Sequence, residues 1–316
     1  MSQPLQLLQT RQHADEDFRL DEMVAALRSA RKEWREKHRR HESRVRELPS
    51  AEALSDILQG LRGVLFPLRL GPPELRLEAE DFYVGHTLET QLRALRQQIL
   101  LELRYAARLQ QTHAALEQKA QAIAAEFAYA LADVRRLLDS DVLAAFEGDP
   151  AARSVDEVLL CYPGVEAMIH HRLAHRLHGL GVPLLARLVA ELAHAKTGID
   201  IHSGAQIGAG FFIDHGTGVV IGETAVIGER VRIYQAVTLG ARSFPTDENG
   251  HITKGAPRHP IVEDDVTIYA GATILGRITL GRGSTIGGNV WLTRSVAPGS
   301  HVTQAGLQHE QLQAGS

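Results

Sequence analysis

The hydrophobic pattern of the chain changes its period near residue 198. Before that point apolar residues recur three or four positions apart, which is typical of helices. Prolines and glycines separate the helical segments, and Ser50 is a suitable N-cap for the second of them. The pattern predicts helices over residues 15–43, 51–61, 87–111, 112–138, 154–160, 164–177 and 183–197. The two long segments, 87–111 and 112–138, form either a hairpin or one long helix.

After Gly198 large aliphatic residues recur every six positions. A small or β-branched residue follows four positions later in most repeats, as at Ala205 and Val231. A six-residue period fits a short strand plus a sharp turn, repeated so that the aliphatic side chains stack inside a prism. Glycine often follows the aliphatic residue, as at Gly208, and we expect glycine and asparagine at the corners to give the turns backbone freedom. The aliphatic positions are Ile201, Ile207, Ile213, Ile221, Ile227, Ile233, Leu239, Val262, Ile268, Ile274, Leu280, Ile286 and Leu292.

Composition narrows the classes of protein to consider. The chain has 316 residues, 44% of them hydrophobic, and a net charge of −4, so it gives no general reason to expect nucleic acid or an anionic membrane as a partner. Cys161 is its one cysteine, which rules out an intramolecular disulfide. No apolar run approaches the roughly 20 residues that span a bilayer, and the N-terminus lacks an apolar signal core. We therefore expect a cytoplasmic protein.

The repeat resembles the hexapeptide signature of left-handed β-helix acyltransferases. Within that group, three segments resemble serine O-acetyltransferase: residues 199–240 (IDIHSGAQIGAGFFIDHGTGVVIGETAVIGERVRIYQAVTLG), Arg258-His259-Pro260, and AGATILG at 270–276. The resemblance covers residues 149–300. It implies an α+β protein, in which an N-terminal all-α helical domain precedes a C-terminal left-handed parallel β-helix of hexapeptide repeats.

The expected domain limits follow from the two periods and the resemblance. Residues 1–198 form the α-helical domain, of which 1–140 are a variable extension and 149–198 lead into the β-helix. Residues 199–300 form the acetyltransferase domain, with an inserted loop at 241–257, and 301–316 form a tail. The resemblance further implies a homotrimer with active sites between subunits, and a pairing of two trimers through the helical domain.

His215 is the candidate general base. A hydroxyl is a poor nucleophile at neutral pH, and histidine has an ordinary pKa close to the pH at which a base must operate. The segment around His215 departs from the repeat, because Ile213 and Ile221 are eight residues apart instead of six. A bulge there could push a side chain into a cleft. By resemblance, Asp200 is the carboxylate that orients this histidine.

The resemblance also assigns the substrate-binding residues. Arg258, helped by His259, would bind the carboxylate of an amino acid, which an arginine fork suits well. Asp149 and Asp214 would bind its ammonium group. His259 is also a candidate for polarising the thioester carbonyl.

Acetyl-CoA is the expected co-substrate, lying in a groove between neighbouring β-helices. The resemblance maps its contacts to Gly240, Ala270, Gly271 and Gly288, where small residues let a pantetheine arm approach the backbone. No metal is expected. A zinc site at His170, His171 and His175 is the alternative, but no HExxH motif or third carboxylate accompanies these histidines.

The resulting hypothesis is a serine O-acetyltransferase that supplies O-acetyl-L-serine for cysteine biosynthesis. One alternative is a hexapeptide acyltransferase for another amine or alcohol. Another is a β-helix protein without this activity, such as a γ-carbonic-anhydrase-like protein with metal ligands at His202, His215 and His259. The loop at 241–257 is either a lid over the CoA arm or a subunit contact. A complex with O-acetylserine sulfhydrylase is not expected, because the chain ends in Ser316 and not in isoleucine.

Overall fold

The computed structural model describes residues 19–37, 48–110, 115–243, 253 and 255–306, which fall into two compact units, 1–46 and 47–316. In the first unit, α1 (Leu20–Lys37) lies within the helix predicted at 15–43; Arg19 precedes the helix, and the other residues of the predicted range are outside the described part. Large parts of the predicted 241–257 loop and 301–316 tail are also outside it. No helix among the described residues is both long and apolar enough to span a membrane.

The second unit begins with helices. They are α2 (Ala51–Leu65), α3 (Pro67–Leu70), the 3-10 turn η1 (Leu77–Ala79), α4 (Glu80–Gln110), α5 (Leu116–Gly148), α6 (Val155–Cys161), α7 (Pro163–Gly179) and α8 (Pro183–Thr197). Ser50 caps α2 as predicted, since its hydroxyl accepts a hydrogen bond from the amide of Ala53. Helices α4 and α5 pack against each other, so the two long segments form a hairpin and not one helix.

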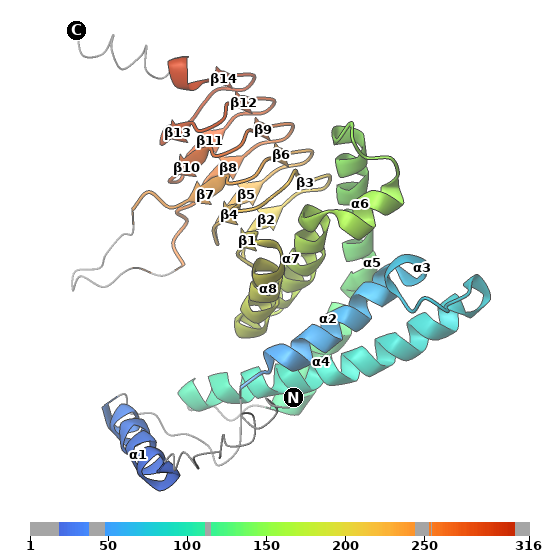
Figure 1. Cartoon of the computed structure of the whole chain (residues 1–316), viewed down its shortest axis with the longest axis vertical. Coiled ribbons are helices and arrows are strands. Elements are labelled where there is room, and N and C mark those ends of the chain that lie inside the picture. Colours follow the sequence, from blue (N-terminus) through green and yellow to red (C-terminus); the bar gives the residue numbers. More distant parts are fainter. Residues whose placement is uncertain (1–18, 38–47, 111–114, 244–252, 254, 307–316) are drawn as a thin grey trace, which may run out of the picture. The chain divides into compact units, whose positions relative to one another are not determined.

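A parallel β-helix follows α8 (Figure 1). Each strand pairs in parallel with the third strand after it in most of the coil, which gives three sheets with the orders β1-β4-β7-β10-β13, β2-β5-β8-β11 and β3-β6-β9-β12-β14. The strands are β1 (Asp200–Ile201), β2 (Gln206–Ile207), β3 (Phe212–Ile213), β4 (Val220–Ile221), β5 (Val226–Ile227), β6 (Arg232–Ile233), β7 (Thr238–Gly240), β8 (Ile261–Val262), β9 (Thr267–Ile268), β10 (Thr273–Leu275), β11 (Thr279–Leu280), β12 (Thr285–Ile286), β13 (Trp291–Leu292) and β14 (His301–Val302).

The aliphatic register predicted from the sequence forms the interior of this prism. Each of the thirteen predicted residues is the second residue of a strand, and all except the half-buried Ile207 are buried. Neighbouring coils stack like on like, as Ile201 on Ile221 and Ile221 on Leu239. Each coil therefore buries its apolar side chains against the coils above and below it.

The glycines directly after the aliphatic residues have a different role from the glycines with positive φ at the corners. Gly208, Gly228 and Gly281 do not have positive φ angles; an added Cβ would instead lie 2.3–2.5 Å from atoms of the next coil. They are needed for close approach between coils. The left-handed backbone conformation predicted for corner glycine and asparagine occurs at Gly210, Gly283 and Asn289, and also at Ala236.

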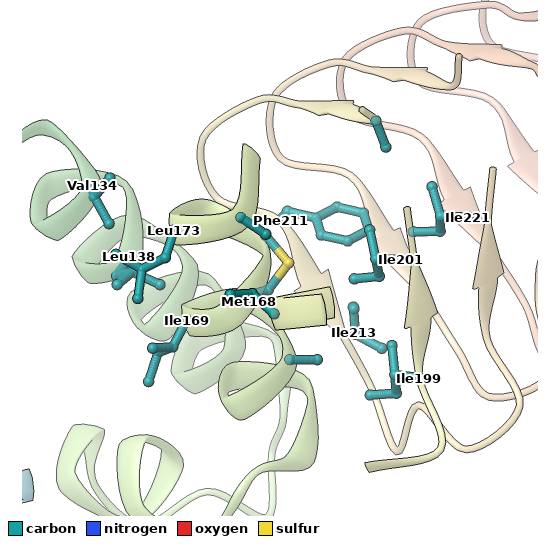
Figure 2. Close-up of a cluster of buried hydrophobic side chains, with 14 of the residues drawn as sticks. Val134, Leu138, Met168, Ile169, Leu173, Ile199, Ile201, Phe211, Ile213 and Ile221 are labelled. Carbon is teal, nitrogen blue, oxygen red and sulfur yellow. The ribbon is translucent and has the colours of Figure 1, made fainter. Parts of the chain in front are cut away.

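One apolar core joins the helices to the first coil of the β-helix. Val134 and Leu138 of α5 lie on the side of α7 that carries Leu173, and Met168 of α7 lies near Phe211 of the first coil (Figure 2). This packing fixes the C-terminal end of α5 against the β-helix, which matters because Asp149 follows directly.

A buried ion pair crosses the same junction. Arg172 of α7 donates to both carboxylate oxygens of Asp141 on α5, at 2.9 and 3.1 Å, and also to the carbonyl of Gly208. Asp141 in turn accepts from the amide of Phe211. Burial raises the pKa of Asp141, against the opposing effect of Arg172. Because removing either partner would leave a buried charge unpaired, the pair restricts how the helices seat on the coil.

Candidate active site

His215 lies on a bulged corner between β3 and β4. The eight residues from Ile213 to Ile221 leave room for an extra turn, in which the amide of Gly216 donates to the carbonyl of Asp214 at 2.7 Å. His215 itself has φ of 59°, and Gly216 has φ of 89°. A Cβ at Gly216 would lie 2.5 Å from the side chain of Ile199, so this turn requires glycine. The His215 side chain is 70% exposed and projects away from the prism.

Asp149 faces this corner from the end of α5. One carboxylate oxygen accepts from the hydroxyl of Tyr162 at 2.5 Å, and the other accepts from the amide of Ala151 at 2.8 Å. The hydrogen bond from Tyr162 lowers the pKa of Asp149, and the same bond raises the pKa of Tyr162 to about 12. Asp149 is therefore held as a carboxylate beside His215, whose charge also acts on it.

Asp214 is the carboxylate closest to the exposed imidazole. Its Oδ1 lies 3.8 Å from Nε2 of His215, and its Oδ2 accepts from Arg232 at 2.6 Å. The Asp214 side chain is only 11% exposed. We call the group of Asp149, Tyr162, Asp214, His215 and Arg232 the acidic corner.

Arg258 and His259 lie at a second corner, which follows β4. Arg258 donates to the carboxylate of Glu223 at 2.7 Å, and its amide donates to the hydroxyl of Thr224 at 2.9 Å. Burial alone would raise the pKa of Glu223, but the hydrogen bond and charge of Arg258 outweigh burial and lower it. We call these four residues the arginine–histidine corner.

The hydrogen bonds of His259 define its tautomer. Nδ1 faces the amide of Thr224 at 3.0 Å and must accept from it. The Thr224 hydroxyl, which accepts from two backbone amides, lies 2.8 Å from the same nitrogen and is placed to donate to it. Nε2 therefore carries the ring proton. Burial, with a contribution from the charge of Arg258, lowers the pKa of His259 to about 4 and keeps the ring neutral.

Asp200 does not contact His215. In the described residues no hydrogen bond or ion pair within 4.0 Å joins the two side chains, although both belong to the first coil. The Asp200 carboxylate instead lies near Glu191 and His194 of α8, with the ligand atoms of all three within 4.8 Å of one another. The predicted dyad is thus not formed in this conformation, and Asp214 is the nearer carboxylate.

Three of the four predicted CoA-contacting residues continue the column of corners that starts at the bulge. The amide of Ala236 donates to the carbonyl of Thr217, the amide of Gly271 to Gln235, and the amide of Asn289 to Ala270. Ala270, Gly271 and Gly288 therefore stack along the same edge of the prism as His215. Gly240 lies at the far end of β7, across the sheet from this edge.

Within one chain the two corners occupy opposite ends of β4. Asp214 and His215 precede this strand, whereas Glu223 and Thr224, which hold Arg258 and His259, follow it. Among the described residues no hydrogen bond or ion pair joins the two groups. A single chain thus separates the acidic corner from the arginine–histidine corner.

Two of the three histidines considered as zinc ligands have hydrogen-bond partners. Nδ1 of His170 contacts the carbonyl of Glu166 and Nδ1 of His175 contacts that of Ser203, whereas Nδ1 of His171 is buried without a hydrogen-bond partner. In the described part of the chain, neither these three nor the set of His202, His215 and His259 brings its ligand atoms together. Burial lowers the pKa of His170, His171, His175 and His202, which favours their neutral forms.

Sequence reasoning missed Tyr162, Arg232 and the Glu223–Thr224 pair. Arg232 can be found from the repeat only when the bulge is counted. The two extra residues make the spacing between stacked residues 20 in this coil, so Arg232 pairs with Phe212 and its side chain reaches the nearby Asp214. Tyr162 carries no such signal, because its partner Asp149 belongs to the helical region.

Comparison with known proteins first defines the class. The family model "Bacterial transferase hexapeptide (six repeats)" matches residues 259–294, within the β-helix. The likeness to solved structures confirms the predicted fold class, a helical N-terminal region followed by a left-handed β-helix. The fold and the repeat therefore define a hexapeptide-repeat transferase.

More similar proteins identify the family within that class. A plasmid-encoded serine acetyltransferase of Synechococcus elongatus is 60% identical over 273 residues, 85% of each chain. The serine acetyltransferase of Mycobacterium tuberculosis is 51% identical over 162 residues, 51% of this chain and 67% of that protein. The crystal structure of Entamoeba histolytica serine acetyltransferase 1 in complex with L-cysteine gives a TM-score of 0.69 at 38% identity, covering 81% of this chain and 87% of that one. The chain belongs to the serine acetyltransferase family.

Proposed function

We propose that this protein is a serine O-acetyltransferase, which transfers the acetyl group of acetyl-CoA to the hydroxyl of L-serine and releases O-acetyl-L-serine and CoA. The observation that carries the proposal is an exposed imidazole, His215, on a bulged corner between two carboxylates, at the start of a column of small residues. O-Acetylserine contains an activated leaving group, which suits it as a precursor of cysteine.

The two corners supply complementary groups for an amino acid. Asp149 and Asp214 offer negative charge for the ammonium group, and Arg258 offers a guanidinium for the carboxylate. His259, neutral and with its proton on Nε2, is a hydrogen-bond donor for either the substrate carboxylate or the thioester carbonyl. A substrate with one ammonium and one carboxylate uses both corners.

Because one chain separates the corners, we propose that a homotrimer completes each site. The acidic corner of one subunit would face the arginine–histidine corner of its neighbour, since the two corners flank the same face of the prism. The acetyl-CoA arm would lie in the groove between these subunits, along Ala270, Gly271 and Gly288, with Gly240 on the opposite wall. Pairing of two trimers through the helical domain remains part of the proposal.

The proposed reaction is direct transfer without an acyl-enzyme. His215 takes the proton of the serine hydroxyl as the serine oxygen attacks the thioester carbon and a C–O bond forms. The tetrahedral intermediate then collapses, the C–S bond breaks, and the CoA thiolate receives the proton from His215. A donor at Nε2 of His259 would stabilise the oxyanion. The reaction needs no group other than the substrates and these side chains.

We propose that the protein works in the reducing cytosol, because its one cysteine is a free thiol.

We propose that a carboxylate orients His215, and the two candidates are Asp214 and Asp200. Asp214 is nearest in this conformation, whereas the Asp200 carboxylate lies near Glu191 and His194. The two assignments differ in a measurable way. If Asp200 orients the base, Asp200→Asn lowers kcat; if Asp214 mainly binds the ammonium group, Asp214→Asn raises KM for serine.

The decisive experiment follows release of free thiol from acetyl-CoA with serine, homoserine or threonine as acceptor. We expect serine to be preferred and His215→Ala to lower kcat by about 10²- to 10⁴-fold with the trimer intact. Lys119→Gln, on an exposed part of α5, serves as a matched surface control with normal activity. Full serine activity in His215→Ala would exclude the proposed base, and preference for another acceptor would favour a different hexapeptide acyltransferase.

A further inference from the structure

Arg232 of β6 links the Asp214 carboxylate to the backbone at the end of α5. Its Nη2 donates to Oδ2 of Asp214 at 2.6 Å, and its Nη1 donates to the carbonyl of Gly148 at 2.8 Å. Gly148 ends α5 and directly precedes Asp149. One guanidinium thus bridges the bulged corner of the β-helix and the helix end that carries the second carboxylate.

Aromatic rings hold this guanidinium in place. Its central carbon lies 4.8 Å from the ring centre of Phe212 and 4.7 Å from that of Tyr234. Tyr234 is itself stacked on Tyr269 of the next coil, with ring centres 5.0 Å apart and planes 15° apart. The Arg232 side chain is 27% exposed, so its position is set by packing as well as by its hydrogen bonds.

The charges of the corner also depend on Arg232. Asp149 and Asp214 contribute two negative charges, and Arg232 contributes one positive charge. The sum is one net negative charge, which matches the single ammonium group of an amino acid. Because Asp214 also lies 3.8 Å from His215, an uncompensated Asp214 would favour the protonated imidazole, which cannot act as a base.

We propose that Arg232 is a positioning residue of the serine site, which fixes Asp214 against the end of α5 and balances its charge beside His215. This inference rests on the proposed function. The other charged and titratable groups near His215 are Asp149 and Tyr162, at the ends of α5 and α6. Asp200 lies on β1, the strand that pairs with β4. All three remain in a variant that changes Arg232 alone.

The test compares Arg232→Gln and Arg232→Lys with Arg230→Gln. Arg230 precedes Arg232 by two residues and pairs with Asp265 on the outside of the prism, so Arg230→Gln removes the same charge away from the site. For each variant, kcat and KM for serine are measured across the pH range in which the acidic limb of the rate profile lies. Thermal unfolding and trimer size are measured in parallel.

For Arg232→Gln we expect KM for serine to rise about tenfold, because Asp214 loses a charged hydrogen bond that fixes it. We expect the acidic limb of kcat to move to higher pH by about one unit, because the base must lose its proton beside an uncompensated carboxylate. Arg232→Lys restores the charge without the fork, so its limb stays near that of the unsubstituted enzyme while KM still rises. Arg230→Gln behaves like the unsubstituted enzyme.

The inference is wrong if Arg232→Gln keeps both the KM and the acidic limb of the unsubstituted enzyme, or if Arg232→Lys moves the limb as far as Arg232→Gln does. If Arg232→Gln does not form trimers, the inference is judged from Arg232→Lys alone, by the acidic limb of its kcat profile and its KM for serine. An unsubstituted enzyme without serine-dependent thiol release would overturn the proposed function itself. Normal activity with an unaffected Arg232→Gln profile would overturn only the role of Arg232.

Discussion

The backbone amide of Thr224 donates to Nδ1 of His259 across 3.0 Å, and the Thr224 hydroxyl lies 2.8 Å from the same nitrogen. Both groups favour a neutral ring with its proton on Nε2. The imidazole is also buried, which opposes protonation further. This corner is therefore built to present a neutral hydrogen-bond donor, and its stability should depend on pH.

The first prediction follows from the pKa of His259, which is lowered from its ordinary value of 6.5 to about 4. Between these values the unfolded chain binds a proton at this position and the folded chain does not, so stability falls as the pH decreases from 6.5 to about 4. His259→Gln removes this contribution. We expect the free energy of unfolding of the unsubstituted protein to approach that of His259→Gln as the pH decreases from 6.5 to about 4.

Urea unfolding of both proteins at a series of pH values measures this difference. The subtraction is needed because His170, His171, His175 and His202, whose pKa values are also lowered, remain in both proteins. A difference that is independent of pH, or that grows toward low pH, would contradict the assignment of a buried neutral ring.

Gly222→Ala is expected to displace His259. A Cβ at Gly222 would lie 2.0 Å from Cδ2 of the His259 ring, closer than any side chain tolerates. The ring must move, and it then loses its contacts with Thr224. We expect kcat/KM to fall about 10²-fold, comparable to the loss of one oxyanion donor, with a modest loss of thermal stability.

Gly85→Ala is the matched control, because no atom lies within 4 Å of the added methyl group and alanine favours the helix in which it lies. Its activity should be unchanged. If Gly222→Ala is as active as Gly85→Ala, then His259 either tolerates the displacement or has no role in the reaction.

The repeat made the interior of the β-helix predictable. Ile221 and Leu239 occupy the positions expected from the six-residue period, because only a residue facing into the prism must be large and aliphatic. The backbone freedom predicted for glycine and asparagine at the corners is present at Gly210, Gly283 and Asn289, but sequence does not distinguish a glycine with a positive φ from one needed for close approach. Gly228 is needed for close approach, because a Cβ there would occupy the space of Asp264 in the next coil.

The candidate site was less predictable for a geometric reason. The order of residues placed His215 on a bulge, but the direction of a side chain depends on packing that the order does not contain. Asp200 therefore lies toward His194 and not against His215. The partners Tyr162 and Arg232 come from a helix end and a neighbouring coil, and only the folded chain brings them to the acidic corner.

The last prediction concerns the division of the site between subunits. Asp214 and His215 precede β4, whereas Arg258 is held beyond its other end by Thr224 and Glu223. If each site combines the acidic corner of one subunit with the arginine–histidine corner of the next, two inactive variants can complement each other. His215→Ala and Arg258→Gln, each inactive alone, are mixed at equal concentration, unfolded and refolded together.

Random assembly should then restore about a quarter of the active sites, because a complete site needs an Arg258→Gln subunit to supply His215 and a His215→Ala subunit to supply Arg258. Thiol release is compared with that of the two variants refolded separately and then mixed, which must remain inactive. Absence of activity after joint refolding, with mixed trimers demonstrated by size and by differential tagging, would mean that each site belongs to one chain and that the acidic corner closes onto its own Arg258.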